Sequence, residues 1–443
     1  MRCSQTHLRL LRFGVIAALF AFTTNGQQKP ANPSPVRLTF QDALERARRN
    51  SVIYQAALAD ARVVREDQKQ AVTALLPSVN YNNAAIYTQG TGVDDQFKFI
   101  GANAIHEYIS QGNVHEALDV AGIVEARRSA AIASIAKARA EIASRGLVVT
   151  VVQSYYGVAA AEKKLDVAQK AADEGDRFLK LTNDLEHGGE VAHSDVIKAE
   201  LQANDRRRQL REAKLGLLNA RLDLAVLIFP NFDDNYELVD DLHAPVTLAS
   251  PAEIEARGAR DNPDIKAALD TVNAAGHGVS IARAGYLPTL NVDYFYGIDA
   301  THFATRTNGV SNLGSSAIAS LNIPVWNWGA TQSKIKQAEF QRDQAQRELS
   351  LAQRKLLAEL KSLYAEAQTA ADELSSLQRS AELGAESLRL TTLRYKNGES
   401  TVLEVVDAQN SATLADAAYE DGAVRYRVAL ANLQTLTGEL TTP

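Results

Sequence analysis

Two acidic side chains near the C-terminus, Glu404 and Asp407, are spaced so that they could act together. They follow a turn at Gly398 and lie three residues apart, so on a helix they share one face. Thr401-x-x-Glu404 also matches a capping box, in which Glu404 would bind backbone N–H at the start of a helix. Glu404 therefore has two interpretations, a free carboxylate or a cap. Asp407 has only the first.

No other residues suggest a catalytic or metal site. His187 and His193 flank a turn at a spacing that does not suit one helix face. The stretch "GHGVS" (Gly276–Ser280) lacks the Gly-x-Ser-x-Gly order of a nucleophile elbow. The single cysteine, Cys3, precedes an apolar run, so the chain beyond it has no thiol for a disulfide, a metal or covalent catalysis. We predict no enzyme, no metal site and no cofactor.

The N-terminus has the pattern of a secretory signal, which we place at residues 1–26. Three arginines precede an apolar run, Phe13–Phe22, and small and polar residues follow. The alternative is a membrane anchor, but the run is short for that. Removing the signal changes the formal charge from −6 to about −9, and an acidic exported chain is a poor candidate for nucleic acid binding. No cysteine follows the signal, so we predict no lipid anchor.

The remaining apolar segments are too short to predict a transmembrane helix. The nearest approach, Gly146–Ala161, is interrupted by Gln153, and we interpret it as a helix buried on most sides. If this protein meets a membrane, strands must cross it, because only helices and closed sheets satisfy the backbone in lipid.

The chain contains an internal repeat of about 210 residues. Three pairs of similar segments occur in the same order, at offsets of 211, 211 and 209: Arg48–Leu58 with Ala259–Leu269, Ala74–Asn82 with Gly285–Asp293, and His187–Glu200 with Lys396–Gln409. We divide the mature chain at this repeat, into residues 27–250 and 251–443. Each unit is predicted to contain a helix, two strands, a long helix, a turn and a second long helix.

The strands of the second unit are the clearer ones. A leading helix is expected over Pro251–Gly285, and Pro288 ends it. Period-2 alternation follows, and it predicts a strand with one polar side and one apolar side. The apolar side carries Leu290, Val292, Tyr294, Tyr296 and Ile298. A polar loop leads to a returning strand at 313–323. The first unit repeats this less cleanly, with strands near 79–87 and 97–110.

Very long helices are expected to follow each strand pair. Between Asn327 and Lys396 there is no proline, and Leu and Ala recur at steps of three and four, which is typical of a coiled coil. About 70 residues at 1.5 Å each give roughly 105 Å. A matching run extends from about Val114 to Glu186, and helices then return to about Phe229 and Leu436. The run Arg206-Arg207-Arg208 is interpreted as a solvated helix face.

Four strands per chain are too few to close a barrel. Their length of about ten residues suits a bilayer, but open strand edges are not tolerated in lipid. Three copies would supply twelve strands and close the sheet. Trp326 and Trp328 follow the fourth strand, where they suit a membrane interface. The alternative is a pair of core tryptophans at a sharp bend.

A signal, a duplicated unit and three motifs occur here in one order: "YLPTLNVDY", "LNIPVWNWG" and "YKNGESTVLEVVDAQNS". Together they resemble the TolC family of outer-membrane efflux channels, over about residues 38–438. The resemblance implies a homotrimer, mainly α with membrane β, that forms a 12-stranded β-barrel in outer-membrane lipid and an α-helical barrel across the periplasm. It implies a diderm bacterium as the source, and as partners a periplasmic adaptor and an inner-membrane transporter of RND, ABC or MFS type.

The resemblance also implies roles for single residues at the helical tips. Glu404 and Asp407 would line the periplasmic aperture, where rings of acids favour cations and repel one another. Asp195 and Tyr395 match positions that latch neighbouring hairpins. The basic residue usual after the second tip is replaced by Ser400, so Arg394 and Lys396 are the candidate substitutes. The first unit lacks the Pro-aromatic-x-x-Gly junction between strand and helix, at Asn113–Ala126.

We therefore predict a passive, gated exit duct for efflux or type I secretion. The alternative is a periplasmic or surface coiled-coil scaffold whose strands form a soluble sheet. A shared duct takes its specificity from the pump, so the sequence names no substrate.

Overall fold

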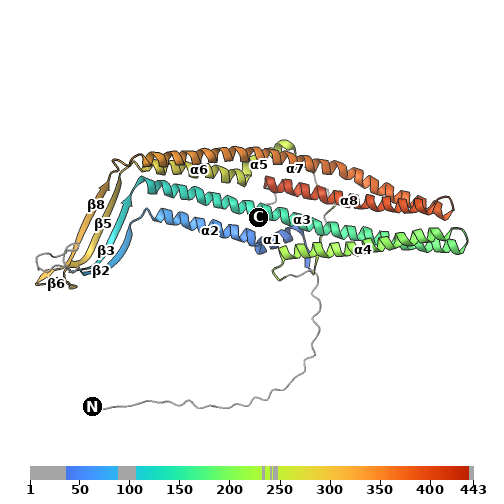
Figure 1. The fold of residues 1–443 in the computed structure, drawn as a ribbon, viewed down its shortest axis with the longest axis horizontal. Helices are drawn as coiled ribbons and strands as arrows, with labels where there is room; N and C mark the ends of the chain where they lie inside the picture. The colour runs from blue at the N-terminus through green and yellow to red at the C-terminus, as the bar shows by residue number, and fades with distance from the viewer. Residues whose placement is uncertain (1–35, 88–105, 232–234, 240–241, 243–247, 439–443) are drawn as a thin grey trace, which may run out of the picture.

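The computed structural model describes residues 36–87, 106–231, 235–239, 242 and 248–438. The predicted signal and the first part of the predicted strand at 97–110 lie outside these ranges. Figure 1 shows an elongated molecule with a sheet at one end and the tips of two long helical hairpins at the other.

The sheet has four antiparallel strands in the order β2-β3-β5-β8. They are β2 (Ser78–Tyr87), β3 (His106–Leu118), β5 (Thr289–Ala300) and β8 (Leu313–Asn322). Among the described residues, the two outer strands, β2 and β8, each pair on one side only. A short hairpin, β6 (Arg306–Thr307) with β7 (Val310–Ser311), lies within the predicted polar loop.

The predicted end of the first unit's second strand was wrong. Strand β3 continues to Leu118, because its residues up to that point pair with β5. The following helix begins at Val120 rather than near Val114. Asp119 caps its start, because its side chain accepts a hydrogen bond from the Gly122 N–H.

The leading segment of each unit is two helices, not one. They are α1 (Phe40–Asn50), α2 (Val52–Thr73), α5 (Pro251–Asp261) and α6 (Pro263–Ala284). The break in the second unit follows from Pro263, which has no N–H and suits only a first turn. Asn262 caps the new helix by accepting from the N–H groups of Asp264 and Ile265.

Four long helices form the two hairpins: α3 (Val120–His187), α4 (His193–Ile228), α7 (Ala330–Lys396) and α8 (Val402–Thr437). The predicted ends of α4 and α8, and both predicted bounds of α7, agree with the structure to within three residues. Near the sheet, the helices lie side by side in the same order as the strands to which they connect. Helix α2 packs on α3, α3 on α6 and α6 on α7. The outermost helices α2 and α7 are thus open on one side, and α2 has no buried residue.

The main core lies midway along the molecule, around the apolar part of α3. Val148, Val151, Val152 and Tyr155 are at most 1% exposed, which confirms the prediction of a helix buried on most sides. Two short strands complete this region, β1 (Val36–Leu38) parallel to β4 (Tyr236–Leu238). The Tyr155 hydroxyl donates to the Val239 carbonyl, 2.9 Å away. The sequence pattern did not predict these strands, since three residues carry no periodicity.

Candidate functional site

One face of the sheet is apolar and exposed. In β5, Val292, Tyr294 and Tyr296 are 36%, 46% and 55% exposed, while Leu290 and Ile298 are half-buried. On β2, the exposed side chains Val79 and Tyr81 belong to the same face. Soluble proteins rarely expose so much contiguous apolar surface, so this face suits contact with lipid or with another protein.

The opposite face carries polar side chains. His115 Nδ1 lies 2.8 Å from Asp293 Oδ1, and Asn113 donates to the same oxygen at 3.2 Å. The register places Asn80 beside Asn113 and Ser78 beside His115. The predicted polar and apolar sides of β5 are therefore separated as expected, with Phe295 as the exception on the polar side.

The two tryptophans lie at the junction between sheet and helices. Trp326 and Trp328 are 75% and 89% exposed, so the alternative of core tryptophans is wrong for this protomer. Their rings meet edge to face with centroids 5.8 Å apart. Trp328 and Gly329 both have positive φ, 57° and 81°, which turns the chain sharply into α7.

At the second tip, Glu404 forms the capping box that the sequence predicted. Its Oε1 accepts from the Thr401 N–H at 3.3 Å, and Thr401 Oγ1 accepts from the Glu404 N–H at 3.3 Å. Ser400 Oγ donates to Oε2 at 2.8 Å, and Arg394 Nη1 is 3.8 Å from the same atom. The Ser400 hydroxyl, then the Thr401 N–H, lower the pKa of Glu404.

Asp407 lies one turn further along α8 and is exposed. Within the described part of the protomer it makes no ion pair and no side-chain hydrogen bond. The two predicted aperture acids therefore differ, because Glu404 is held by its cap and Asp407 is not.

Within the described ranges, the three predicted latch residues form no hydrogen bond or ion pair with one another. Asp195 pairs with Lys198 on its own helix, at 3.2 Å. Arg394 donates to the Glu399 carbonyl at 2.9 Å and approaches Glu404. Tyr395 is only 4% exposed, packs against Phe178 with ring centroids 5.2 Å apart, and has its pKa raised by burial.

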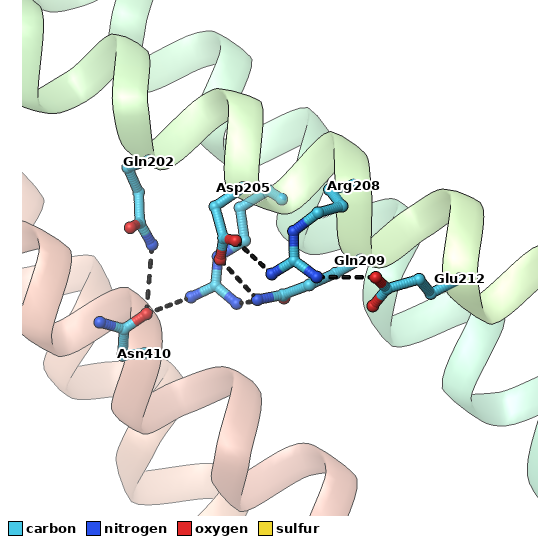
Figure 2. A network of polar contacts seen from close by, with 7 residues as sticks. Gln202, Asp205, Arg208, Gln209, Glu212 and Asn410 are labelled. Atoms are coloured by element: carbon cyan, nitrogen blue, oxygen red, sulfur yellow. Dashed lines mark hydrogen bonds and ion pairs between the residues drawn. The ribbon is translucent and has the colours of Figure 1, made fainter.

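The seam between α4 and α8 holds a polar network that the sequence did not reveal. Arg206 is 4% exposed, and its Nη2 donates to Asn410 Oδ1 at 2.6 Å. Figure 2 shows Asn410 of α8 facing Gln202 of α4 across this seam. The interpretation of Arg206 as solvated was wrong. Its neighbours Arg207 and Arg208 are exposed and pair with acids, so the run itself gave no sign of the buried member.

A cavity of about 650 Å³ lies nearby, between α3, α7 and α8. Its wall includes Lys170, Glu174, Lys396 and Asp416. Burial raises the pKa of both carboxyls, Glu174 and Asp416. The cavity joins the two hairpins and combines both signs of charge with apolar side chains.

Two further observations concern membranes and metals. No helix in the described ranges is both long and apolar enough to cross a bilayer. Among the same residues, no three His, Cys, Asp or Glu side chains gather as metal ligands would.

Comparison with known proteins finds similarity to outer-membrane efflux proteins. Residues 259–439 match the model of the outer membrane efflux protein family. Outer membrane protein OprJ of Pseudomonas aeruginosa is 25% identical over 390 residues, which span 86% of this chain and 78% of that protein. Outer membrane protein TolC of Vibrio cholerae is 25% identical over 268 residues, 60% of this chain and 61% of that protein.

The fold agrees with solved structures. The outer membrane protein VceC from Vibrio cholerae superposes with a TM-score of 0.79 at 16% identity, covering 90% of this chain and 96% of that one. The chain is thus similar in sequence, and over most of its length in fold, to TolC-like outer-membrane efflux proteins.

Proposed function

We propose that this protein is the outer-membrane exit duct of an efflux or type I secretion system, and that it works as a homotrimer. The observation that carries the proposal is the four-stranded sheet, which has one exposed apolar face, one polar face and two open edges. In lipid, the unpaired backbone groups of β2 and β8 must find partners. Three copies joined edge to edge give twelve strands, with the polar faces lining a common interior.

The helices extend the same arrangement. Their order follows the strands, and α2 and α7 are open where the sheet edges are open. Three copies would close this row into a tunnel that continues the barrel. The 68 residues of α3 correspond to roughly 100 Å, enough to carry the tunnel far from the membrane. In this arrangement Trp326 and Trp328 sit at the periplasmic membrane interface.

We place the gate at the helical tips. Glu404 and Asp407 stand on the first turns of α8, and three copies would bring their carboxylates around one axis. A tip latch at Asp195, Tyr395 and Arg394 would hold neighbouring hairpins together, and the packing of Tyr395 of α7 against Phe178 of α3 supports this. Similarity to outer-membrane efflux and secretion proteins supports a periplasmic adaptor and an inner-membrane transporter, of RND, ABC or MFS type, as the partners at this end.

The test is to express the whole chain with its signal and to purify it from outer membranes. The proposal predicts a heat-resistant trimer and ion conductance in planar bilayers. Spin labels at Tyr294 and Tyr296 distinguish the scaffold alternative, because they would sense lipid in a channel and protein or water in a soluble sheet. A dissolved monomer with both positions shielded from lipid would overturn the proposal.

A further inference from the structure

We infer that Lys198 is the counter-charge of Asp407 and sets the cation affinity of the aperture. This assignment rests on the proposed function, because it has meaning only if the helical tips form the gate. Lys198 lies on the first hairpin, whereas the acidic pair Glu404 and Asp407 lies on the second.

The two hairpins are equivalent at their tips. Helix α4 begins at His193 and α8 at Val402, an offset of 209 residues. At this offset the buried faces coincide, with three pairs of small apolar residues: Val196 with Val405, Ala199 with Ala408, and Ala203 with Ala412. The two helices therefore present the same remaining faces to their surroundings. Asp195 occupies the position of Glu404, and Lys198 occupies the position of Asp407.

The seam between α4 and α8 independently places Lys198 at the level of Asp407. The Arg206–Asn410 hydrogen bond fixes the register, and Gln202 Nε2 lies 3.1 Å from the same Asn410 oxygen. Both helices start at the tip and run away from it (Figure 1). Lys198 lies one turn nearer the tip than Gln202, and Asp407 lies about one turn nearer than Asn410. The two side chains therefore occupy the same level of the seam.

The charges around Lys198 leave Asp407 as its open partner. The Lys198 ammonium pairs with Asp195 at 3.2 Å, with its side chain 55% exposed. Glu404 already has Ser400 and Arg394 as partners. An exposed lysine on a flexible four-carbon stem can move from one carboxylate to another at little cost. In a trimer, Lys198 would offset part of the negative potential that Asp407 creates, and so weaken the binding of cations in the aperture.

The experiment measures block of the open channel by Mg²⁺ in planar bilayers, using the whole chain. Lys198→Ala should lower the half-blocking concentration by about threefold, because the acids lose their counter-charge. Asp195→Asn should raise it, because Lys198 is then free to neutralise Asp407. Lys198→Arg, which keeps the charge, should behave as wild type. In an Asp407→Asn background, Lys198→Ala should change the half-blocking concentration little, because the two residues are coupled.

Lys214→Ala is the matched control. It removes an exposed lysine from the same helix, 16 residues further from the tip. If Mg²⁺ blocks the Lys198→Ala and Lys214→Ala channels at the same concentration, the assignment of Lys198 is wrong, but the proposed channel function is unaffected. If the purified wild-type protein carries no current, the proposed function fails, and the assignment fails with it.

Discussion

At the scale of single residues, Glu404 and Asp407 show how one sequence pattern gives two different side chains. Their spacing predicts a shared helix face, and both are exposed. Glu404 is nevertheless held by Thr401, Ser400 and Arg394, whereas Asp407 has no such partners in the described protomer. Hydrogen bonds that hold a carboxylate lower its pKa and fix its place, so the two acids are not interchangeable.

Substitution should therefore separate the two acids. Asp407→Ala should weaken divalent-cation block of conductance by about tenfold, and Glu404→Ala by about twofold, because the Glu404 charge is already partly offset. The double variant should lose block most fully. Titration of single channels with Mg²⁺ measures this, and unchanged block in the double variant would remove both residues from the gate.

Glu174 in the cavity between the hairpins gives a pH dependence. Burial raises its pKa above the ordinary 4.5, and Asp416 raises it further. Between 4.5 and the raised pKa, the folded state keeps a proton that the unfolded state releases, so stability falls as pH rises through this window.

Replacing Glu174 by Gln should remove this part of the pH dependence. Its side chain is 41% exposed and partly screened, so we expect a gain of only about 1–2 °C in the apparent thermal midpoint at neutral pH. Glu200→Gln, at an exposed position on α4, is the control. Circular dichroism melts across pH 5 to 8 measure the effect; parallel pH profiles for wild type and Glu174→Gln would contradict it.

Arg206 and Tyr395 each pack against a neighbour from the other hairpin that the sequence does not indicate. In the sequence, Arg206 is one of three consecutive arginines that we interpret as solvated. In the structure, it bonds to Asn410 of α8. Tyr395 matches a latch position by its motif, but its hydroxyl is buried beside Phe178. Spacing along one helix cannot predict such contacts, because they depend on how two helices pack.

At the scale of elements, the repeat accounts for most of what the sequence predicted correctly. It extends to packing, since Gly175 and Gly384 are 209 residues apart and each lies where its hairpin partner comes close. A Cβ at these positions would lie 3.4 Å from Ala203 Cα and 3.1 Å from Ala412 Cα, respectively. The failures occur where one local feature overrides the periodicity: the Asn262 cap with Pro263, and the pairing that extends β3 to Leu118.

Gly297 is the element-scale position where we expect the largest effect of a single methyl group. A Cβ there would lie 2.3 Å from the Ser110 carbonyl oxygen and 2.4 Å from Gln111 Cα, both backbone atoms of β3. Gly297→Ala should push β3 and β5 apart and cost about 1–3 kcal/mol. The heat resistance of the assembled protein should fall accordingly.

Gly314 provides the control, because it pairs with Gly297 across the sheet and has open space where its Cβ would be. Gly314→Ala should leave heat resistance nearly unchanged. Equal losses in the two variants would show that the close approach of β3 and β5 does not limit stability.

At the scale of the whole molecule, the two tryptophans offer a test of contact with the membrane. They are the only tryptophans among 443 residues, so intrinsic fluorescence observes the sheet–helix junction alone. In vesicles containing brominated lipids, emission should fall by about half, because exposed interfacial rings meet the lipid. Trp326→Phe and Trp328→Phe assign the signal to each ring. Emission that brominated lipids leave unchanged would place the junction away from the bilayer.

The central claim is that copies of this chain join edge to edge around a hollow axis. Strands β2 and β8 are the two edges of one sheet, with β3 and β5 between them. At about 4.8 Å per strand, the edges of one copy are too far apart for a disulfide. The one native cysteine, Cys3, lies in the predicted signal. A cysteine on β2 and another on β8 can therefore link only different copies.

The decisive measurement is disulfide cross-linking in outer membranes of chains that carry Asn80→Cys or Asn82→Cys together with Ser316→Cys or Ser320→Cys. These four positions lie on the polar face of the two edge strands. Under non-reducing electrophoresis, we predict bands of one, two and three linked chains, and none larger, for the cysteine pair in register. Chains with a single cysteine should give bands of at most two linked chains. A chain that stays monomeric with every pair, or a ladder that continues beyond three, would contradict the closed trimeric channel.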